Sequence, residues 1–281
     1  MNANILSVTK DIIKSRFPMI VKLHNTYKTT ISSYRKTMSD ILLNLCTMLL
    51  PNGFYVQMMP YGIIDKINNL ERDIESYNTL EGKKNVRDTN RVLTIRLLLK
   101  LVESFDSGHY AELGTHRGHC AKLIWNNMNS NAKLYCFDSF EGFSEFDVDI
   151  EKTTLGTQAA VGHLSDTSVE IAVRNILGVG QESNRLIMLK GYFPKTFEGL
   201  ANIPWRFINL DFDLYEPTRE ALELMWPQLV HGGIVLIHDY NNPKYLGVKK
   251  ATDEFFIKHC IVPIPLNDYA GSALVIKSLA K

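Results

Sequence analysis

The chain has 281 residues, of which 45% are hydrophobic and 22% are charged, and this is the composition of a folded, soluble protein. Its 31 basic residues nearly balance its 30 acidic ones, which argues against a general nucleic-acid-binding surface. The four cysteines lack the paired spacing of a zinc site or a disulfide framework, so they indicate a reducing, cytoplasmic setting.

The amino-terminal third has the pattern of a helical segment. Residues 1–87 carry helix-like spacing that is interrupted over 49–62 by prolines and glycines. Residues 1–17 mix charge into their apolar positions and do not read as a secretory signal. The apolar stretch 41–50 is shorter than the roughly 20 residues that span a bilayer, so no integral membrane segment is expected. A polar passage then predicts a domain boundary near Arg87.

From residue 88 onward, strand-like runs alternate with helical patterns. After a helical pattern at 91–105, the strand-like runs are 109–113, 133–137, 185–190, 206–212 and 233–239, and the helix-like segments are 121–128, 169–177, 218–229 and 247–256. The alternation predicts an α/β fold with a Rossmann-like, doubly wound and mostly parallel sheet. The last two strand-like segments, 260–266 and 272–278, have no helix between them and predict an antiparallel hairpin at one edge.

The turn after the first strand has the features of a ligand site. Glu112 lies near the end of that strand, and Gly114 and Gly118 follow where backbone and ligand come close in an open α/β sheet. His116 occupies a position where a dinucleotide fingerprint has glycine, which disfavours a pyrophosphate. Asp138 follows about 20 residues later, at the spacing of an acid that binds ribose hydroxyls. The pattern therefore predicts an adenosine without phosphates, and the structural alternative is a turn whose glycines only make room for packing.

Five sequence blocks together resemble the class I S-adenosylmethionine-dependent methyltransferases, and within them the macrocin O-methyltransferase family. The blocks are AELGTHRG (111–118), CFDSFEGF (136–143), LKGYFPKT (189–196), DFDLYEPT (211–218) and GGIVLIHDYN (232–241), and the likeness covers about residues 88–281. The resemblance implies S-adenosylmethionine as the methyl donor, and residues 1–87 as a lid or a dimerisation segment, with 41–62 as the candidate lid. The expected donor-binding residues are Glu112, Gly114, Thr115, Gly118, Asp138, Ser139, Gly191, Tyr192 and Asp211.

Acidic residues and a histidine lie at the ends of the fourth and fifth strand-like runs. Asp211 and Asp213 are separated by one residue at the end of the fourth run, so they point the same way if the strand persists. His238 and Asp239 lie at the end of the fifth run, and adjacent strands are expected to bring the two pairs together beside the donor. Several buried like charges are costly unless they are paired, solvated or bound to metal, which favours a functional cluster. The structural alternatives are that Asp213 caps the next helix and that Asp239 holds the turn after its strand.

The resemblance also implies a divalent ion, usually magnesium, for this cluster. Its ligands by position are Asp211, His238 and Asp239, and Asp213 is the candidate general base. His238 departs from the family pattern, in which two consecutive acids are expected, and magnesium prefers oxygen ligands to imidazole. The alternatives are that His238 is itself the base, or that it is only a hydrogen-bonded spacer.

The sequence as a whole predicts a cytoplasmic O-methyltransferase that acts on a hydroxyl of a sugar or another small polyhydroxylated acceptor. A homodimer is expected, without nucleic-acid or integral-membrane partners. The alternatives are an N-methyltransferase of the same fold, a nicotinamide-dependent oxidoreductase and a non-catalytic ligand-binding scaffold. His163 lies in the insert 157–168, which either folds over the site or remains plain surface.

Overall fold

The computed structural model describes Asp73, Thr79–Leu80, Lys83–Lys84 and residues 88–278. All of them belong to one compact unit, Ile67–Lys281. The predicted helical cap at 1–87, its boundary at Arg87 and the candidate lid at 41–62 lie almost wholly outside the described residues, so these remain predictions. Two short strands, β1 (Thr79–Leu80) and β2 (Lys83–Lys84), pair antiparallel.

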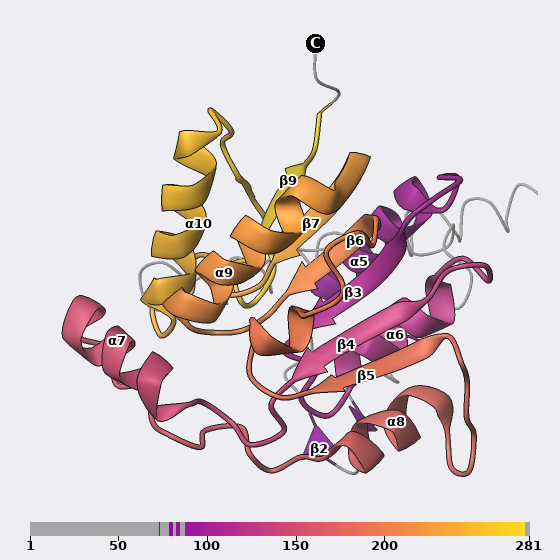
Figure 1. Cartoon of the computed structure of the whole chain (residues 1–281), viewed down its shortest axis with the longest axis horizontal. Coiled ribbons are helices and arrows are strands. Elements are labelled where there is room, and N and C mark those ends of the chain that lie inside the picture. Colours follow the sequence, from indigo (N-terminus) through magenta and orange to yellow (C-terminus); the bar gives the residue numbers. More distant parts are fainter. Residues whose placement is uncertain (1–72, 74–78, 81–82, 85–87, 279–281) are drawn as a thin grey trace, which may run out of the picture. The chain divides into compact units, whose positions relative to one another are not determined.

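A seven-stranded sheet in the order β5-β4-β3-β6-β7-β9-β8 forms the centre of this unit (Figure 1). Its strands are β3 (His109–Leu113), β4 (Leu134–Asp138), β5 (Leu186–Lys190), β6 (Trp205–Leu210), β7 (Leu229–Ile237), β8 (Ile264–Pro265) and β9 (Ala273–Ile276). The first five strands run parallel, whereas β9 pairs antiparallel with both β7 and β8. The predicted mostly parallel sheet with an antiparallel edge hairpin is therefore confirmed.

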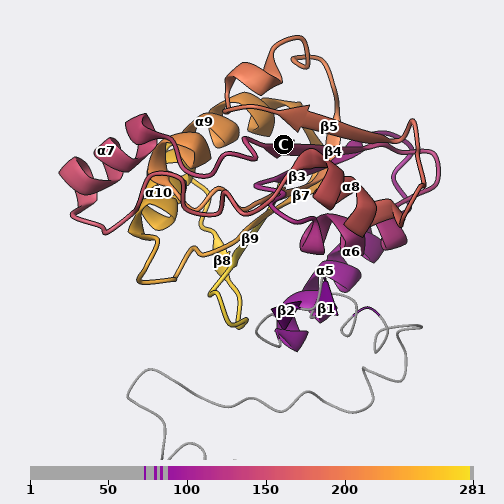
Figure 2. The same ribbon diagram turned by 90° about the horizontal axis from the view of Figure 1, so that it is seen from below.

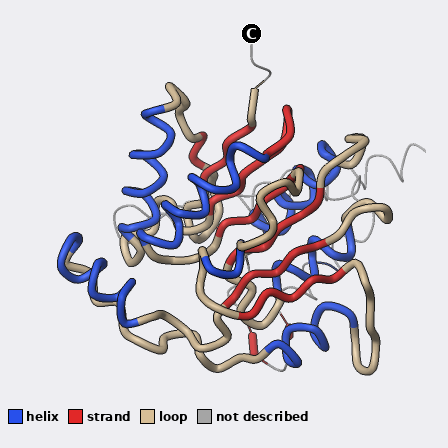
Figure 3. Tube along the Cα trace, viewed as in Figure 1, coloured by secondary structure: helices blue, strands red, loops and turns tan. Residues whose placement is uncertain are grey.

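Helices cover both faces of the sheet, as its doubly wound order requires (Figures 2 and 3). The helices α5 (Thr89–Val102), α6 (His119–Asn127) and α8 (Val169–Leu177) form one layer. The helices α9 (Tyr215–Met225) and α10 (Leu246–Lys258) form the other, together with the short turns Lys195–Phe197 and Trp226–Gln228. No described helix is both long and apolar enough to cross a membrane.

One further helix, α7 (Glu145–Leu155), packs against α9 and α10 and was not predicted from periodicity. Only Val148 and Glu151 of this helix are buried, so it has almost no apolar stripe to detect. Its two ends have typical capping residues instead. The Ser144 hydroxyl accepts a hydrogen bond from the Asp147 N–H, and Gly156 adopts a left-handed conformation. These capping residues are the sequence signal from which the helix could have been predicted.

The main core lies between the sheet and the α9–α10 layer. Side chains that alternate along the strands, such as Ala111 and Leu113 on β3, face this layer and meet Trp226 and Phe256. The opposite side of the same strands faces α5 and α6 and includes Tyr110 and Glu112. A strand that is buried on both faces thus presents a carboxylate to one helical layer.

Two predicted strands are shorter than their apolar runs. Only Ile264–Pro265 of the run 260–266 pairs, because the N–H groups of Cys260 and Ile261 are bonded to the end of α10 and Pro263 has no N–H to donate. β6 ends at Leu210, so the strand does not persist through Asp213 as the alternation argument assumed. The approach of Asp213 to its neighbours therefore needs another explanation.

Candidate active site

The carboxyl ends of four parallel strands meet at one level of the sheet. Leu113 of β3 pairs with Phe137 of β4 and with Leu210 of β6. Leu210 in turn pairs with Ile237 of β7. The residues that directly follow these four paired positions are Gly114, Asp138, Asp211 and His238. The fold thus brings the predicted donor turn and the predicted acidic cluster to one edge, where ligands of open α/β sheets lie.

The two glycines of the first turn are required by packing. Gly114 has a φ of +87°, and a Cβ built there would lie 1.9 Å from the main-chain oxygen of Asp211. Gly118, at +83°, would place a Cβ 2.9 Å from Ile176 of α8. Glycine at 114 is what allows the ends of β3 and β6 to approach so closely, so the structural reason for these glycines holds whether or not a ligand binds.

Asp138 lies on the opposite side of this turn and is fixed by two backbone amides. Its Oδ2 accepts the His116 N–H at 2.7 Å and its Oδ1 accepts the Phe140 N–H at 2.6 Å. Burial raises the pKa of Asp138, while these amide hydrogen bonds act in the opposite direction. The carboxyl is therefore held in one orientation and retains lone pairs for a ligand.

Two hollows open on this edge of the sheet. The first hollow is lined by residues from four strand ends and from α7, and includes Gly114, His116, Asp138, Ser139, Phe143, Asp147, His163, Leu164, Gly191, Tyr192, Phe193 and Asp213. The second hollow is lined by Asp88, Arg91, Glu112, Gly114, Thr115, His119, Leu164, Asp211, Asp213, His238, Asp239, Asn242, Tyr245, Tyr269 and Ala270, among others. The hollows share Gly114, His116, Leu164, Asp211 and Asp213. Ligands in the two hollows would meet at this shared wall.

The predicted donor residues are distributed unevenly over these hollows. Ser139, Gly191 and Tyr192 line the first hollow, although the Ser139 hydroxyl already donates to the Gly142 oxygen at 3.0 Å. Thr115 lines the second hollow but is almost fully buried, and its hydroxyl lies 3.5 Å from the Phe137 oxygen. Gly118 is absent from both linings; it is the residue that precedes α6.

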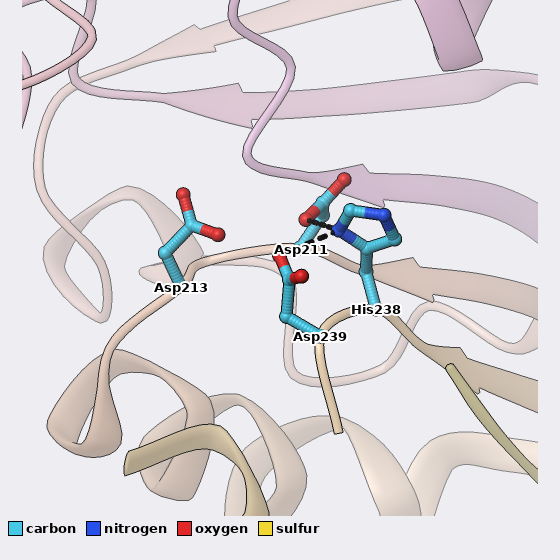
Figure 4. Close-up of side chains that lie close together, drawn as sticks. All are labelled: Asp211, Asp213, His238 and Asp239. Carbon is cyan, nitrogen blue, oxygen red and sulfur yellow. Dashed lines mark ion pairs between the residues drawn. The ribbon is translucent and has the colours of Figure 1, made fainter. Parts of the chain in front are cut away.

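Four side chains converge at the ends of β6 and β7 (Figure 4). One potential ligand atom each from Asp211, Asp213, His238 and Asp239 lies within 4.8 Å of the others. His238 Nδ1 is 2.6 Å from Asp211 Oδ1 and 2.8 Å from Asp239 Oδ2. Nδ1 therefore lies close to one oxygen of each carboxylate. Its single N–H can be aimed at only one of these two oxygens at a time.

Backbone conformation places two of these acids. Asp213 has a φ of +64° and Asp239 of +56°, both in the left-handed region that few non-glycine residues adopt. The turn after β6 directs the Asp213 side chain back into the cluster, which the assumption of a continuing strand had missed. Asp213 does not cap α9, since the residue at that position is Leu214 and no side chain bonds there. Asp239 does hold its turn, because its Oδ1 accepts the Asn242 amide at 2.6 Å.

Electrostatics set the protonation states of two members of the cluster. Burial and the positive charge of Arg91 act to lower the pKa of His238. The charges and hydrogen bonds of Asp211 and Asp239 outweigh both and raise it to about 10. Burial raises the pKa of Asp213 well above its usual range, and the neighbouring carboxylates raise it further. At neutral pH the imidazole is therefore charged, and the surroundings of Asp213 favour its protonated form.

A buried polar network behind the cluster was not predicted. Arg91 of α5 is 1% exposed, and its guanidinium donates to Ser272 Oγ at 3.1 Å, Asn209 Oδ1 at 3.3 Å and Asp211 Oδ2 at 3.4 Å. The Asn209 side-chain amide in turn donates a hydrogen bond to Glu112 Oε1 at 3.3 Å, so Glu112 belongs to the same network. The sequence carried one signal for it, because Arg91 falls on the same helical stripe as the buried apolar residues of α5. A charged residue on such a stripe needs a buried partner.

Glu112 gives the first testable prediction. Burial, followed by the charge of Asp211, raises its pKa to about 8 from an ordinary value near 4.5. The unfolded chain loses the Glu112 proton near pH 4.5, and the folded protein loses it only near pH 8. Protonated Glu112 therefore stabilises the fold fully below about pH 4.5, and this stabilisation is lost as the pH rises from about 4.5 to 8. We expect Glu112→Gln to gain stability relative to the parent by roughly 1.4 kcal/mol per pH unit between pH 5 and 8.

Denaturant unfolding curves of the ligand-free protein at several pH values measure this difference. The control is Glu182→Gln, since Glu182 is an exposed carboxylate in the loop between α8 and β5. A constant stability difference between Glu112→Gln and the parent across this range would show that Glu112 ionises normally in the fold.

The insert 157–168 folds against the turn that carries His116. Asp166 Oδ1 lies 2.9 Å from His116 Nε2, and the Arg117 guanidinium donates to the Asp166 main-chain oxygen at 2.6 Å. The Thr167 hydroxyl donates to the His116 oxygen at 2.7 Å. Because His163 and Leu164 line the first hollow, the insert is part of the site wall and not plain surface.

Comparison with known proteins gives these features a family context. A family model described as Macrocin-O-methyltransferase (TylF) matches residues 84–273. A Streptomyces olivaceus protein described as 8-demethyl-8-(2,3-dimethoxy-alpha-L-rhamnosyl)-tetracenomycin-C 4'-O-methyltransferase is 33% identical over 139 residues. That alignment covers 47% of this chain and 53% of the relative, so the matched region spans about half the length of the curated relative.

Solved structures share the fold at low sequence identity. The O-methyltransferase NovP aligns with a TM-score of 0.59 and 20% identity, covering 75% of this chain and 98% of that chain. CalS11, described as a calicheamicin methyltransferase, aligns with a TM-score of 0.53 and 21% identity, covering 66% of this chain and 78% of that chain. These likenesses concern the architecture of the sheet and its helices.

Proposed function

Given that this chain belongs to the macrocin O-methyltransferase family and is an S-adenosylmethionine-dependent methyltransferase, we propose that it methylates a hydroxyl of a sugar or a similar polyhydroxylated small molecule. The observation that carries the proposal is the shared wall of the two hollows, where the donor turn at Gly114 meets Asp211 and Asp213. Methyl transfer needs the acceptor oxygen in line with the sulfonium methyl, and such a junction suits that geometry. The description of the Streptomyces olivaceus relative, which names a rhamnosyl group, supports the acceptor class.

In this proposal the donor lies with its adenosine in the first hollow. Its ribose hydroxyls donate to Asp138, and its adenine lies beside Gly191 and Tyr192. Its α-ammonium lies at Glu112 in the second hollow, where Oε2 has no hydrogen-bond partner among the described residues. An ammonium ion there would satisfy a buried carboxylate that is otherwise costly. Thr115, Gly118 and Ser139 then act mainly by shaping the turns around the donor.

We also propose that the acidic cluster holds a divalent cation. The donor set fits, because the carboxylates of Asp211 and Asp239 supply the hard oxygen ligands that magnesium and manganese prefer. Asp211, His238 and Asp239 would be the ligands, with Asp213 beside them. A bound cation would lower the pKa of the acceptor hydroxyl.

Protonation states favour cation assistance over catalysis by a side-chain base alone. His238, with a pKa near 10, is already protonated at neutral pH and cannot accept a proton. Burial and the neighbouring carboxylates likewise favour the protonated form of Asp213. Added positive charge would lower the pKa of both groups and favour their deprotonated forms, so the proposed base role of Asp213 depends on the cation.

Cation binding tests this part of the proposal without any acceptor. Calorimetric titration of the protein with MnCl₂ or MgCl₂, in buffers of different ionisation enthalpy, counts the protons that are released. We expect one to two protons per cation at pH 7, from His238 and Asp213. No binding by millimolar Mn²⁺ would remove the cation from the mechanism, and binding without proton release would contradict the protonated state of His238 and Asp213.

Turnover tests the proposed reaction itself. S-adenosylhomocysteine formation from S-adenosylmethionine is measured with a panel of methyl hexopyranosides, methyl α-L-rhamnopyranoside included, and with amino-sugar analogues as nitrogen acceptors. We expect hydroxyl-dependent turnover that falls about 100-fold with excess chelator. Turnover with the amino-sugar analogues alone would instead make the protein an N-methyltransferase. Hydroxyl methylation that resists the chelator would show that the reaction needs no cation.

The insert 157–168 gives a prediction about the donor alone. Removing the Asp166 carboxylate breaks its contact with His116, an exposed pair worth up to about 1 kcal/mol, or about fivefold in a rate. We expect Asp166→Ala to speed S-adenosylhomocysteine dissociation about fivefold in stopped-flow displacement. The matched control is the exposed neighbour Ser165→Ala, which should dissociate at the parent rate. Equal rates for all three proteins would mean that the insert does not retain the donor.

A further inference from the structure

The loop between β8 and β9 presents an exposed aromatic ring to the second hollow. Tyr269 is 71% exposed, yet it lines that hollow together with the buried Ala270. An exposed tyrosine alone would be unremarkable on a protein surface. This one stands at the mouth of a hollow whose floor holds Asp211, His238 and Asp239.

Hydrogen bonds hold the loop in place on two sides. The Tyr269 N–H donates to Asp88 Oδ2 at 2.9 Å, and the same carboxyl caps α5 by accepting the Arg91 N–H. On the other side, the Asn241 N–H donates to the Gly271 oxygen at 2.8 Å, which ties the loop to the turn carrying Asp239.

The loop is also braced from within. Asp268 Oδ1 accepts the Ser272 N–H at 2.7 Å, and the Leu266 N–H donates to the Ser272 oxygen at 2.8 Å. Asn90 adds an amide hydrogen bond to the Asn267 oxygen at 2.9 Å. The ring of Tyr269 is therefore presented by a fixed backbone, so little ordering of the chain opposes a ligand that packs on it.

A second tyrosine lies deeper in the same hollow. Tyr245, which precedes α10, is half-buried, and its backbone N–H is held by the Asn242 oxygen at 3.1 Å. Burial raises its pKa, and the charges of Asp213, Asp239 and Asp211 raise it further. Its hydroxyl consequently keeps its proton and can donate a hydrogen bond beside the acidic cluster.

The chemistry of this hollow matches one class of acceptor. A pyranose ring has C–H groups on its faces and hydroxyls around its edge, so it needs an apolar plate on one side and hydrogen-bonding groups on the other. Tyrosine provides a flat apolar surface at low entropic cost, and carboxylates and the Tyr245 hydroxyl provide the polar contacts. A wholly apolar acceptor would cover the polar groups of the floor without offering them a hydrogen bond.

We propose that the part of the second hollow lined by Tyr245 and Tyr269 is the acceptor subsite for a hexopyranose. Tyr269 is the plate against one sugar face, and Tyr245 is a hydrogen-bond donor to a hydroxyl next to the one methylated. This inference rests on the proposed function and assigns the acceptor to a position within it. Tyr269 and Tyr245 act here as specificity-determining residues, and neither takes part in the transfer itself.

Acceptor kinetics separate this role from a structural one. With methyl α-L-rhamnopyranoside, or the best substrate of the panel, Tyr269→Ala should raise the KM for the acceptor about tenfold with kcat changed less than threefold. Tyr269→Trp should restore the parent KM, because it keeps a flat ring. The affinity for S-adenosylhomocysteine should stay within twofold in both variants. The matched control is Phe146→Ala on α7, an aromatic ring that is 67% exposed but lines neither hollow.

Binding measured without turnover provides an independent readout. Saturation-transfer NMR of methyl α-L-rhamnopyranoside with the protein saturated in S-adenosylhomocysteine should give a signal on the ring C–H protons that Tyr269→Ala loses and Phe146→Ala keeps. An unchanged KM and an unchanged NMR signal in Tyr269→Ala would overturn the subsite while leaving the methyltransferase function intact. Failure of the parent protein to bind or methylate any pyranoside would overturn the subsite and the proposed sugar acceptor together.

Discussion

Asp239→Asn is expected to lower kcat for methyl transfer by about 1,000-fold, within the range for loss of a group that assists proton removal. The change removes a charge 2.8 Å from His238 Nδ1 and one of the proposed cation ligands. Asparagine tolerates the left-handed φ of +56° and keeps an oxygen that can accept the Asn242 amide. The fold should therefore survive the substitution. Initial rates of S-adenosylhomocysteine formation at saturating donor and acceptor measure the effect.

Two measurements keep this result interpretable. Calorimetric titration should give an S-adenosylhomocysteine affinity within about threefold of the parent, because Asp138 and its amide contacts are untouched. The control substitution is Asp253→Asn on α10, a carboxylate that accepts the Tyr240 hydroxyl away from both hollows. If Asp239→Asn retained more than a tenth of the parent kcat, the acidic cluster would not be the catalytic centre.

Gly114→Ala is expected to destabilise the protein by about 3 kcal/mol or more and to abolish donor binding. The new methyl group would lie 1.9 Å from the Asp211 oxygen and 2.7 Å from its carbonyl carbon, so the ends of β3 and β6 must separate. Overpacking of this kind costs roughly 1–3 kcal/mol, and the left-handed backbone adds about 1–2 kcal/mol. Urea denaturation and calorimetric titration with S-adenosylhomocysteine measure the two effects.

Gly156→Ala provides a matched control for this substitution. Gly156 ends α7 at a φ of +66°, and a Cβ there would have nothing within 4 Å. Alanine at position 156 therefore has the conformational cost of a positive φ without a steric clash. Gly156→Ala should lower the free energy of unfolding by only about 1 kcal/mol. Equal losses at the two positions would mean that the close approach of β6 to the first turn imposes no steric requirement.

Most of the fold could be predicted from hydrophobic periodicity, and much of the candidate site could be predicted from the polar residues at strand ends. Alternating apolar runs predicted the parallel strands and the edge hairpin, and the polar residues at the ends of those runs predicted Asp138, Asp211 and His238 as neighbours. This works because the side-chain period of strands and the common level of parallel strand ends are set by backbone geometry. The identity of the ligands at those ends rests on the proposals above.

Features that depend on long-range contacts could not be predicted from the sequence. Arg91 reaches Asp211 across 120 positions of the chain, and nothing local indicates that contact. The helix α7 lacks an apolar stripe, and Asp213 enters the cluster through a left-handed turn that a strand pattern does not show. Pairing partners and turn conformations are decided by packing, so they become visible only in three dimensions.

The residues with left-handed backbone around the hollows also affect how this protein responds to heating. His116, Leu164, Asp213 and Asp239 all have positive φ values and all line a hollow, and each such conformation stores about 1–3 kcal/mol. We expect warming to relax these turns before it disrupts the aromatic core against α9 and α10. Heat inactivation of the ligand-free enzyme is thus expected several degrees below its melting point, and bound S-adenosylhomocysteine should narrow that interval.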